Sequence, residues 1–136
     1  MMMQYRYLYR AKRIDNGEWV EGYLSYPFCM EKGNESYYFY AKDSLDFFCR
    51  CVVDASTICQ CTGVKDKNGK LIWENDIVSY CDCTKEDYVI AWEQNKACFE
   101  YQEYSCSMMN FDELSGCEVE VIGNIFDNLE LLDEEL

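Results

Sequence analysis

The sequence has 136 residues, 49% of them hydrophobic and 16% aromatic, and its 12 basic residues against 26 acidic residues give a net charge of −14. A chain of this length and hydrophobic content can bury a core of its own, so we expect a single domain, residues 1–136. The strong negative charge repels phosphate backbones and anionic lipids, which disfavours direct nucleic-acid binding and attachment to membranes.

The first predicted element is a β-hairpin over residues 5–26. Tyrosine recurs at every second position through residue 9, which is the alternation expected of a strand over residues 5–12. The Asp-Asn-Gly run at residues 15–17 is a typical turn sequence. Residues 19–26 alternate again as a second strand, until Pro27 stops regular pairing.

The next segment gives weaker signals. Residues 36–40 form a short aromatic run and residues 47–53 a second apolar run, and both predict strands, whereas residues 41–46 are polar and indeterminate. Residues 54–57 predict an irregular link or a single helical turn, because short polar side chains compete for local backbone hydrogen bonds.

Residues 60–80 carry the strongest hairpin signal in the chain. Asn68-Gly69 lies between two β-prone runs, and both residues tolerate the positive φ of a tight turn. Gly63 marks the entry to the hairpin, and Asp76 can accept backbone N–H groups and so fix the start of the next strand. We therefore predict a structural motif of five residues, which are Gly63, Asp66, Asn68, Gly69 and Asp76.

Residues 58–123 as a whole predict a β meander. Residues 105–115 predict a surface loop before the last strand, which we expect Gly123 to end, and residues 128–136 predict a short acidic tail with one to three helical turns. The expected fold is mainly β, a bent antiparallel sheet or a small SH3-like barrel with little helix, because closure removes exposed edges. After the central hairpin, the predicted strands are residues 77–83, 88–93, 97–104 and 118–122.

Ten cysteines raise the alternatives of disulfide bonding and metal binding. The chain begins MMMQYRYLYR with no apolar signal segment, which favours a reduced, cytoplasmic protein. No run approaches the roughly 20 apolar residues of a membrane span. Zinc thiolate sites usually have wider spacing than C-x-C, so we favour packing of buried thiols over metal binding. The three C-x-C pairs are Cys49/Cys51, Cys59/Cys61 and Cys81/Cys83.

Catalytic groups are scarce. The chain contains no histidine, which removes the usual base of cysteine and serine nucleophiles. Acid–base or magnesium chemistry by Asp66, Glu74, Asp76 and Asp82 defines an alternative, a metal-assisted hydrolase, but Asp in turns is common for backbone reasons alone. We expect no enzyme activity, no bound metal and no cofactor.

Charged and aromatic residues are unevenly distributed. Four basic residues precede the first acid, and no Lys or Arg follows Lys96, so the two ends could pair within a chain or between subunits, although a solvated acidic face is the simpler interpretation. The aromatic run at residues 37–40 could stack single-stranded nucleic acid, but only Lys42 and Arg50 lie close by in sequence, so core packing and subunit contact are favoured.

Four segments carry the most distinctive motifs of the chain, and in chain order they are RAKRIDNGEWVEGYL from Arg10, TICQCTGVKDKNGKLIWENDIVSY from Thr57, VIAWEQNKACF from Val89 and VIGNIFDNLELL from Val121. Together these segments resemble the YopX-like family of small phage and prophage proteins. Cys61, Asn75 and Leu129 depart from the family pattern, which usually has tyrosine, glycine and often proline there. The resemblance implies a largely β protein carried by a mobile element of Gram-positive bacteria, and it implies no particular reaction.

These observations together predict a phage or prophage accessory protein that acts through protein–protein contact and forms a homo-oligomer. The aromatic middle and the acidic C-terminal third would supply the interaction surface. A different function is also open, in which the acidic surface imitates DNA and occupies a basic nucleic-acid-binding protein.

Overall fold

The computed structural model describes residues 7–27, 37–42, 48–80, 87–95, 97–103, 108–110 and 119–132, and these are mostly β, as the sequence predicts. They form two antiparallel sheets that fit the predicted bent-sheet form, and neither closes into a barrel within the described ranges. The chain divides into two compact units, residues 1–61 and 62–136, which we call the N-terminal unit and the C-terminal unit. The single-domain organisation stays a prediction.

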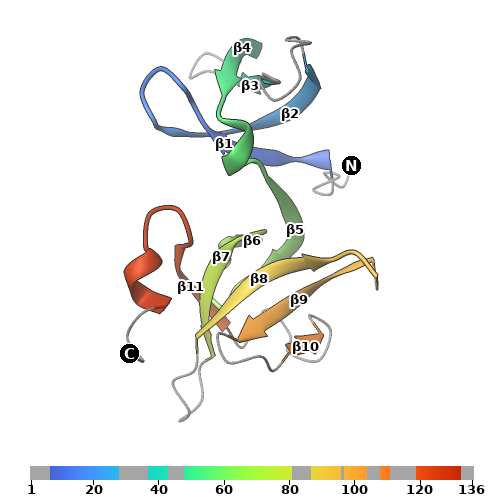
Figure 1. Ribbon diagram of the computed structural model, residues 1–136, viewed down its shortest axis with the longest axis vertical. Coiled ribbons are helices and arrows are strands. Elements are labelled where there is room, and N and C mark those ends of the chain that lie inside the picture. The colour runs from blue at the N-terminus through green and yellow to red at the C-terminus, as the bar shows by residue number, and fades with distance from the viewer. Residues whose placement is uncertain are drawn as a thin grey trace. The chain divides into compact units, whose positions relative to one another are not determined.

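The N-terminal unit contains an antiparallel sheet whose neighbouring strands are in the order β4-β3-β2-β1 (Figure 1). The predicted pairing of an N-terminal hairpin is present, because Lys12 pairs with Trp19 and residue 9 with residue 22. The first strand is shorter than predicted, since it begins at Tyr9 and Tyr7 lies in a 3-10 turn, while residues 5 and 6 lie outside the described residues. The second strand does not stop before Pro27, because Pro27 pairs with Tyr37 after an irregularity in register, and the end of a strand tolerates proline. The strands are β1 (Tyr9–Lys12), β2 (Trp19–Pro27), β3 (Tyr37–Lys42) and β4 (Phe48–Val53).

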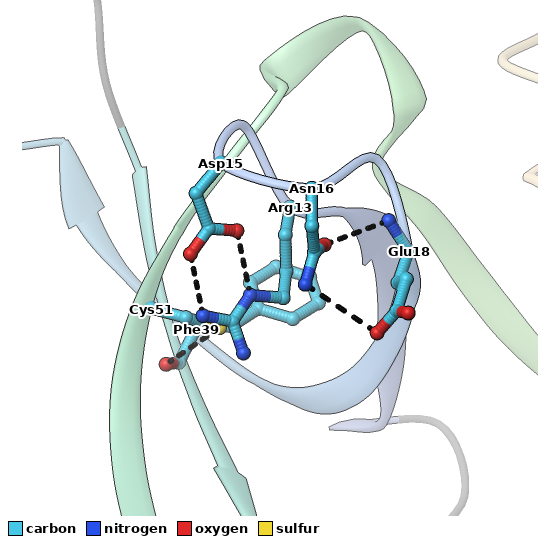
Figure 2. Close-up of polar contacts among 6 residues, drawn as sticks. All are labelled: Arg13, Asp15, Asn16, Glu18, Phe39 and Cys51. Carbon is cyan, nitrogen blue, oxygen red and sulfur yellow. Dashed lines mark hydrogen bonds and ion pairs between the residues drawn. The ribbon is translucent and has the colours of Figure 1, made fainter.

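The turn between β1 and β2 is held by short polar contacts (Figure 2). The Arg13 guanidinium donates to both carboxylate oxygens of Asp15, at 2.9 and 2.7 Å, and this hydrogen bond holds the pKa of Asp15 below its ordinary value. Asn16 Oδ1 accepts the Glu18 N–H at 2.9 Å. Gly17 lies at φ 72°, the left-handed conformation that favours glycine in this kind of turn.

A small core lies under one face of this sheet. Cys51 Sγ lies 3.8 Å from the carbonyl oxygen of Phe39, which Figure 2 also shows. The predicted helical turn after β4 is confirmed as a 3-10 helix, η2 (Ala55–Thr57), and its N-cap Asp54 accepts the Ser56 N–H at 3.0 Å. The buried core residues are Ala11, Phe39, Cys51 and Val53, with Tyr9, Val20, Tyr37 and Ile58 packed against them.

The C-terminal unit is built around a second antiparallel sheet in the order β10-β9-β8-β7-β11 (Figure 1). The strand β5 (Cys59–Lys65) begins in the N-terminal unit beside β1, continues into the C-terminal unit and is followed by β6 (Leu71–Trp73). The remaining strands are β7 (Asp76–Tyr80), β8 (Asp87–Glu93), β9 (Cys98–Glu103), β10 (Met108–Asn110) and β11 (Val119–Asn124). The core of this unit is Ile72, Val78, Tyr88, Ile90, Tyr101 and Val119.

Two predictions about this sheet were wrong in detail. The predicted surface loop contains β10, which pairs with β9 from Met108 opposite Gln102 to Asn110 opposite Glu100. The last strand continues through Gly123 to Asn124, with a shift of register between Val121 and Gly123. Both features depend on a partner strand, which the local sequence pattern does not contain.

The acidic tail begins with a second 3-10 helix, η4 (Leu129–Leu132), and residues 133–136 lie outside the described residues. Leu129 is 56% exposed, whereas Leu131 and Leu132 are half-buried. In the part of the chain that the structure describes, no helix has the length and hydrophobicity of a membrane span.

Candidate functional site

The carboxylate of Asp66 joins the central turn to the edge strand β11. Its Oδ1 accepts the N–H groups of Asn68 and Lys70, both at 2.9 Å, and its Oδ2 accepts the Val121 N–H at 3.0 Å. The side chain is 5% exposed. The turn and β11 are therefore fastened together through one buried carboxylate, across 55 residues of sequence.

The electrostatics of this carboxylate follow from its donors. Burial alone would raise the pKa of Asp66, but the N–H groups of Val121, Lys70 and Asn68 stabilise the ionised form and the net result is a pKa below the ordinary value of 3.8. The folded state therefore stabilises the ionised form of Asp66.

Other residues of the turn also contact β11 or stabilise the turn itself. Gly69 lies at φ 81° and donates its N–H to the Asp66 carbonyl oxygen at 3.0 Å, and Gly63 also lies at φ 81°. Asn68 Nδ2 donates to Glu120 Oε1 at 3.3 Å, and Lys67 Nζ lies 3.6 Å from Glu120 Oε2. Three of the five predicted motif residues, Asp66, Asn68 and Gly69, therefore lie in one turn that contacts β11, and Gly63 lies in the preceding strand β5.

Asp76 lies apart, at the start of β7. Its Oδ2 accepts the Trp73 N–H at 2.9 Å, and the residue is 1% exposed. Asn75, just before it, has φ 70°, which explains why the family pattern usually has glycine at this position. This pair fixes the turn between β6 and β7, the type of backbone role expected for Asp76.

This geometry bears on the carboxylates considered for catalysis. The carboxylates of Asp66 and Asp76 accept hydrogen bonds from backbone N–H groups and so stabilise the local backbone. Asp82 lies outside the described residues. Among the residues with described positions, no three Cys, Asp or Glu side chains gather as a metal site would require.

The C-x-C cysteines are described only in part. Cys51, Cys59 and Cys61 are buried, and Cys59 Sγ lies 3.2 Å from the Thr57 carbonyl oxygen. The side chain of Cys49 and the whole of Cys81 and Cys83 lie outside the described residues. Packing as small buried side chains accounts for the three that are described.

A second candidate site lies on the N-terminal sheet, on the face opposite the core. Alternation along each strand places the core residues on one side, and the register places Tyr23 beside Tyr40 and Tyr40 beside Arg50 on the other. On the same side, Lys12 pairs with Trp19 and Arg10 with Glu21. We call this surface the cation–aromatic face, and it comprises Arg10, Lys12, Trp19, Tyr23, Tyr40 and Arg50.

The side chains of this face combine positive charge with exposed aromatic rings. The Arg10 guanidinium carbon lies 4.8 Å and Lys12 Nζ 5.4 Å from the Trp19 ring centroid, both within cation–π range. Tyr23 is 43% and Tyr40 44% exposed, and Arg50 is also exposed. Three cations and three aromatics therefore share the face with one described acid, Glu21.

Sequence reasoning missed this face. It considered the residues near Tyr37–Tyr40 only along the chain, and so found Lys42 and Arg50 but not Arg10, Lys12 or Trp19. The alternation in residues 9–12 and 19–24 indicates which side chains of β1 and β2 share a face. It does not indicate that β3 lies next to β2, because the irregular register of that pair is not specified by a single sequence.

The family comparison agrees with the motifs. The model of the YopX protein family matches residues 8–133. The chain belongs to the YopX family. The match includes nearly all of both units, and the resemblance inferred from the four sequence segments is confirmed.

A solved structure shares the fold of this YopX-family chain. Protein EF1440 from Enterococcus faecalis is similar with a TM-score of 0.56 and 25% sequence identity, over 91% of this chain and 96% of that chain. A comparison with curated proteins gives no match.

Proposed function

We propose that this YopX-family protein is a non-enzymatic accessory protein of a phage or prophage, acting in the bacterial cytoplasm through protein–protein contact and associating with copies of itself. The observation that carries this proposal is the cross-strand pair of exposed tyrosines, Tyr23 and Tyr40, on the cation–aromatic face. The phage origin rests on the family resemblance.

The chemistry of the face suits a protein partner. Tyrosine and tryptophan offer a large contact area for little loss of conformational entropy, and Tyr, Trp and Arg are enriched where interfaces bind most strongly. Two neighbouring strands hold the tyrosines side by side, so a partner meets a preformed surface. A nucleic-acid ligand is disfavoured because the whole chain carries a charge of −14.

A non-enzymatic role is supported by the use that the fold makes of its best-placed carboxylates. Asp66 accepts three backbone N–H groups, and Asp76 accepts the Trp73 N–H. The bonds to Asp66 favour its ionised state over a state that exchanges protons with a substrate.

Sedimentation velocity at tens of micromolar tests the proposal. The wild-type chain should form a defined oligomer, and the double variant Tyr23→Ser/Tyr40→Ser should sediment as a monomer. The matched control is Tyr7→Ser, which removes a 54% exposed tyrosine that lies outside the strands of the sheet. A monomeric wild type, or a double variant as oligomeric as the control, would reject self-association through this face.

A further inference from the structure

The negative charge of the chain is concentrated in one unit. Residues 1–61 contain seven Lys and Arg against eight Asp and Glu, a net charge of −1, whereas residues 62–136 contain five against 18, a net charge of −13. The cation–aromatic face belongs to the nearly neutral N-terminal unit. A surface with opposite charge is therefore available within the same polypeptide.

One segment of the C-terminal unit combines exposed acidic side chains with exposed hydrophobic side chains. Residues 119–132, the acidic segment, contain no Lys or Arg and present exposed Asp127 and Glu130. The same segment also exposes two large hydrophobic side chains, since Ile122 is 37% and Leu129 56% exposed. A segment that carries both carboxylates and aliphatic side chains is complementary to a face that carries cations and aromatic rings.

We infer that the cation–aromatic face of one copy binds the acidic segment, residues 119–132, of a second copy. This inference rests on the proposed self-association and specifies which surfaces meet. Arg50 and its neighbouring cations face Asp127 and Glu130 of the next molecule, and the tyrosines cover the exposed leucine and isoleucine of that segment.

The contact joins two different surfaces, the face of one copy and the acidic segment of another. Two copies can make this contact twice across a twofold axis, or each copy can bind a different neighbour through each surface and so build a ring or a filament. In either case each copy of the assembly contributes both surfaces. The assembly is expected to weaken with salt, since exposed charges contribute to it.

Charge reversal on each side tests this inference. Arg50→Glu and Glu130→Lys should each weaken association at least about tenfold, because like charges then meet across the contact. A chain that carries both substitutions should recover much of the lost association, since the signs are opposite again. Lys65→Glu makes the same charge change at an exposed cation outside both surfaces and should leave association unchanged.

Sedimentation velocity from about 0.05 M to about 0.5 M salt is the measurement, because that range shortens the screening length severalfold. Support for the inference requires a wild-type oligomer that dissociates as salt rises, weakened single variants and a recovered double variant. A wild-type oligomer that neither single variant weakens would overturn the pairing of surfaces while leaving self-association intact. A wild-type monomer would overturn both, as would a face that instead binds a fluorescent single-stranded oligonucleotide in an Arg50-dependent way.

Discussion

Asp66 is the residue whose local chemistry most affects the C-terminal unit. The Asp-Lys-Asn-Gly sequence predicted the turn. Within it, the Asp66 carboxylate accepts two backbone N–H groups, as aspartate often does in turns. The third, from Val121, could not be predicted, because no short-range pattern indicates which strand will lie beside the turn. This turn residue therefore also makes a long-range connection to β11.

Asp66→Asn should destabilise the protein by about 1–3 kcal/mol, because one of the N–H groups now accepted would face an amide donor in a buried site. Urea unfolding followed by tryptophan fluorescence measures the change. The control is Asp15→Asn, in the β1–β2 turn, where the carboxylate is exposed and the cost should be much smaller. Equal losses in the two variants would contradict the role assigned to Asp66.

The lowered pKa of Asp66 predicts how its contribution varies with pH. Since the folded pKa lies below the ordinary value of 3.8, the ionised group stabilises the fold above that pH, and this stability is lost as pH falls through the folded pKa. The difference in unfolding free energy between wild type and Asp66→Asn should therefore shrink below about pH 4. A difference that stays constant from neutral pH to pH 3 would mean that the charge does not matter.

Asn75 shows how a departure from the family pattern can preserve the backbone. Its φ of 70° is accessible to glycine and asparagine but costly for a β-branched residue. Asn75→Gly should change stability little, whereas Asn75→Val should cost on the order of 1–2 kcal/mol. Thermal unfolding of both variants measures this, and a Val variant as stable as the Gly variant would show that backbone strain at this position is unimportant.

At the scale of elements, the strands themselves were largely predictable and their partners were not. Alternation and turn residues located β1, β2 and the hairpin around Asn68-Gly69. The strand β10 was missed because its short sequence, Met108–Asn110, becomes a strand only beside β9. The cation–aromatic face was missed for the same reason, because it exists only through the register of four strands.

The end of β11 offers a prediction at this scale. A Cβ at Gly123 would lie 2.5 Å from Asn128 Oδ1 and 2.8 Å from Asn128 Cβ, and Asn128 Oδ1 accepts the Asn124 N–H at 3.2 Å. Gly123→Ala should therefore cost about 1–3 kcal/mol by overpacking.

A double-mutant cycle with Asn128→Ala separates this clash from other effects. Once the Asn128 side chain is absent, adding the Gly123 methyl group should cost much less, so the two changes should couple strongly. Additive losses of unfolding free energy, measured by urea titration, would show that Gly123 is required for a reason other than its approach to Asn128.

At the scale of the whole molecule, the main feature is the uneven distribution of charge along the chain. The sequence indicated a basic beginning and an acidic end, and the structure places part of the basic beginning on a sheet face with exposed aromatic side chains. The net charge of −13 on residues 62–136, against −1 on residues 1–61, is the basis of the proposed contact between unlike surfaces of different copies.

The most direct test of the account places a photo-cross-linking amino acid at position 40, in a mixture of unlabelled and isotopically labelled chains. Cross-linked peptides that contain one labelled and one unlabelled partner identify contacts between copies. The account predicts such mixed products joining residue 40 to residues 119–132. Cross-links found only within single chains, or only to other surfaces, would contradict it.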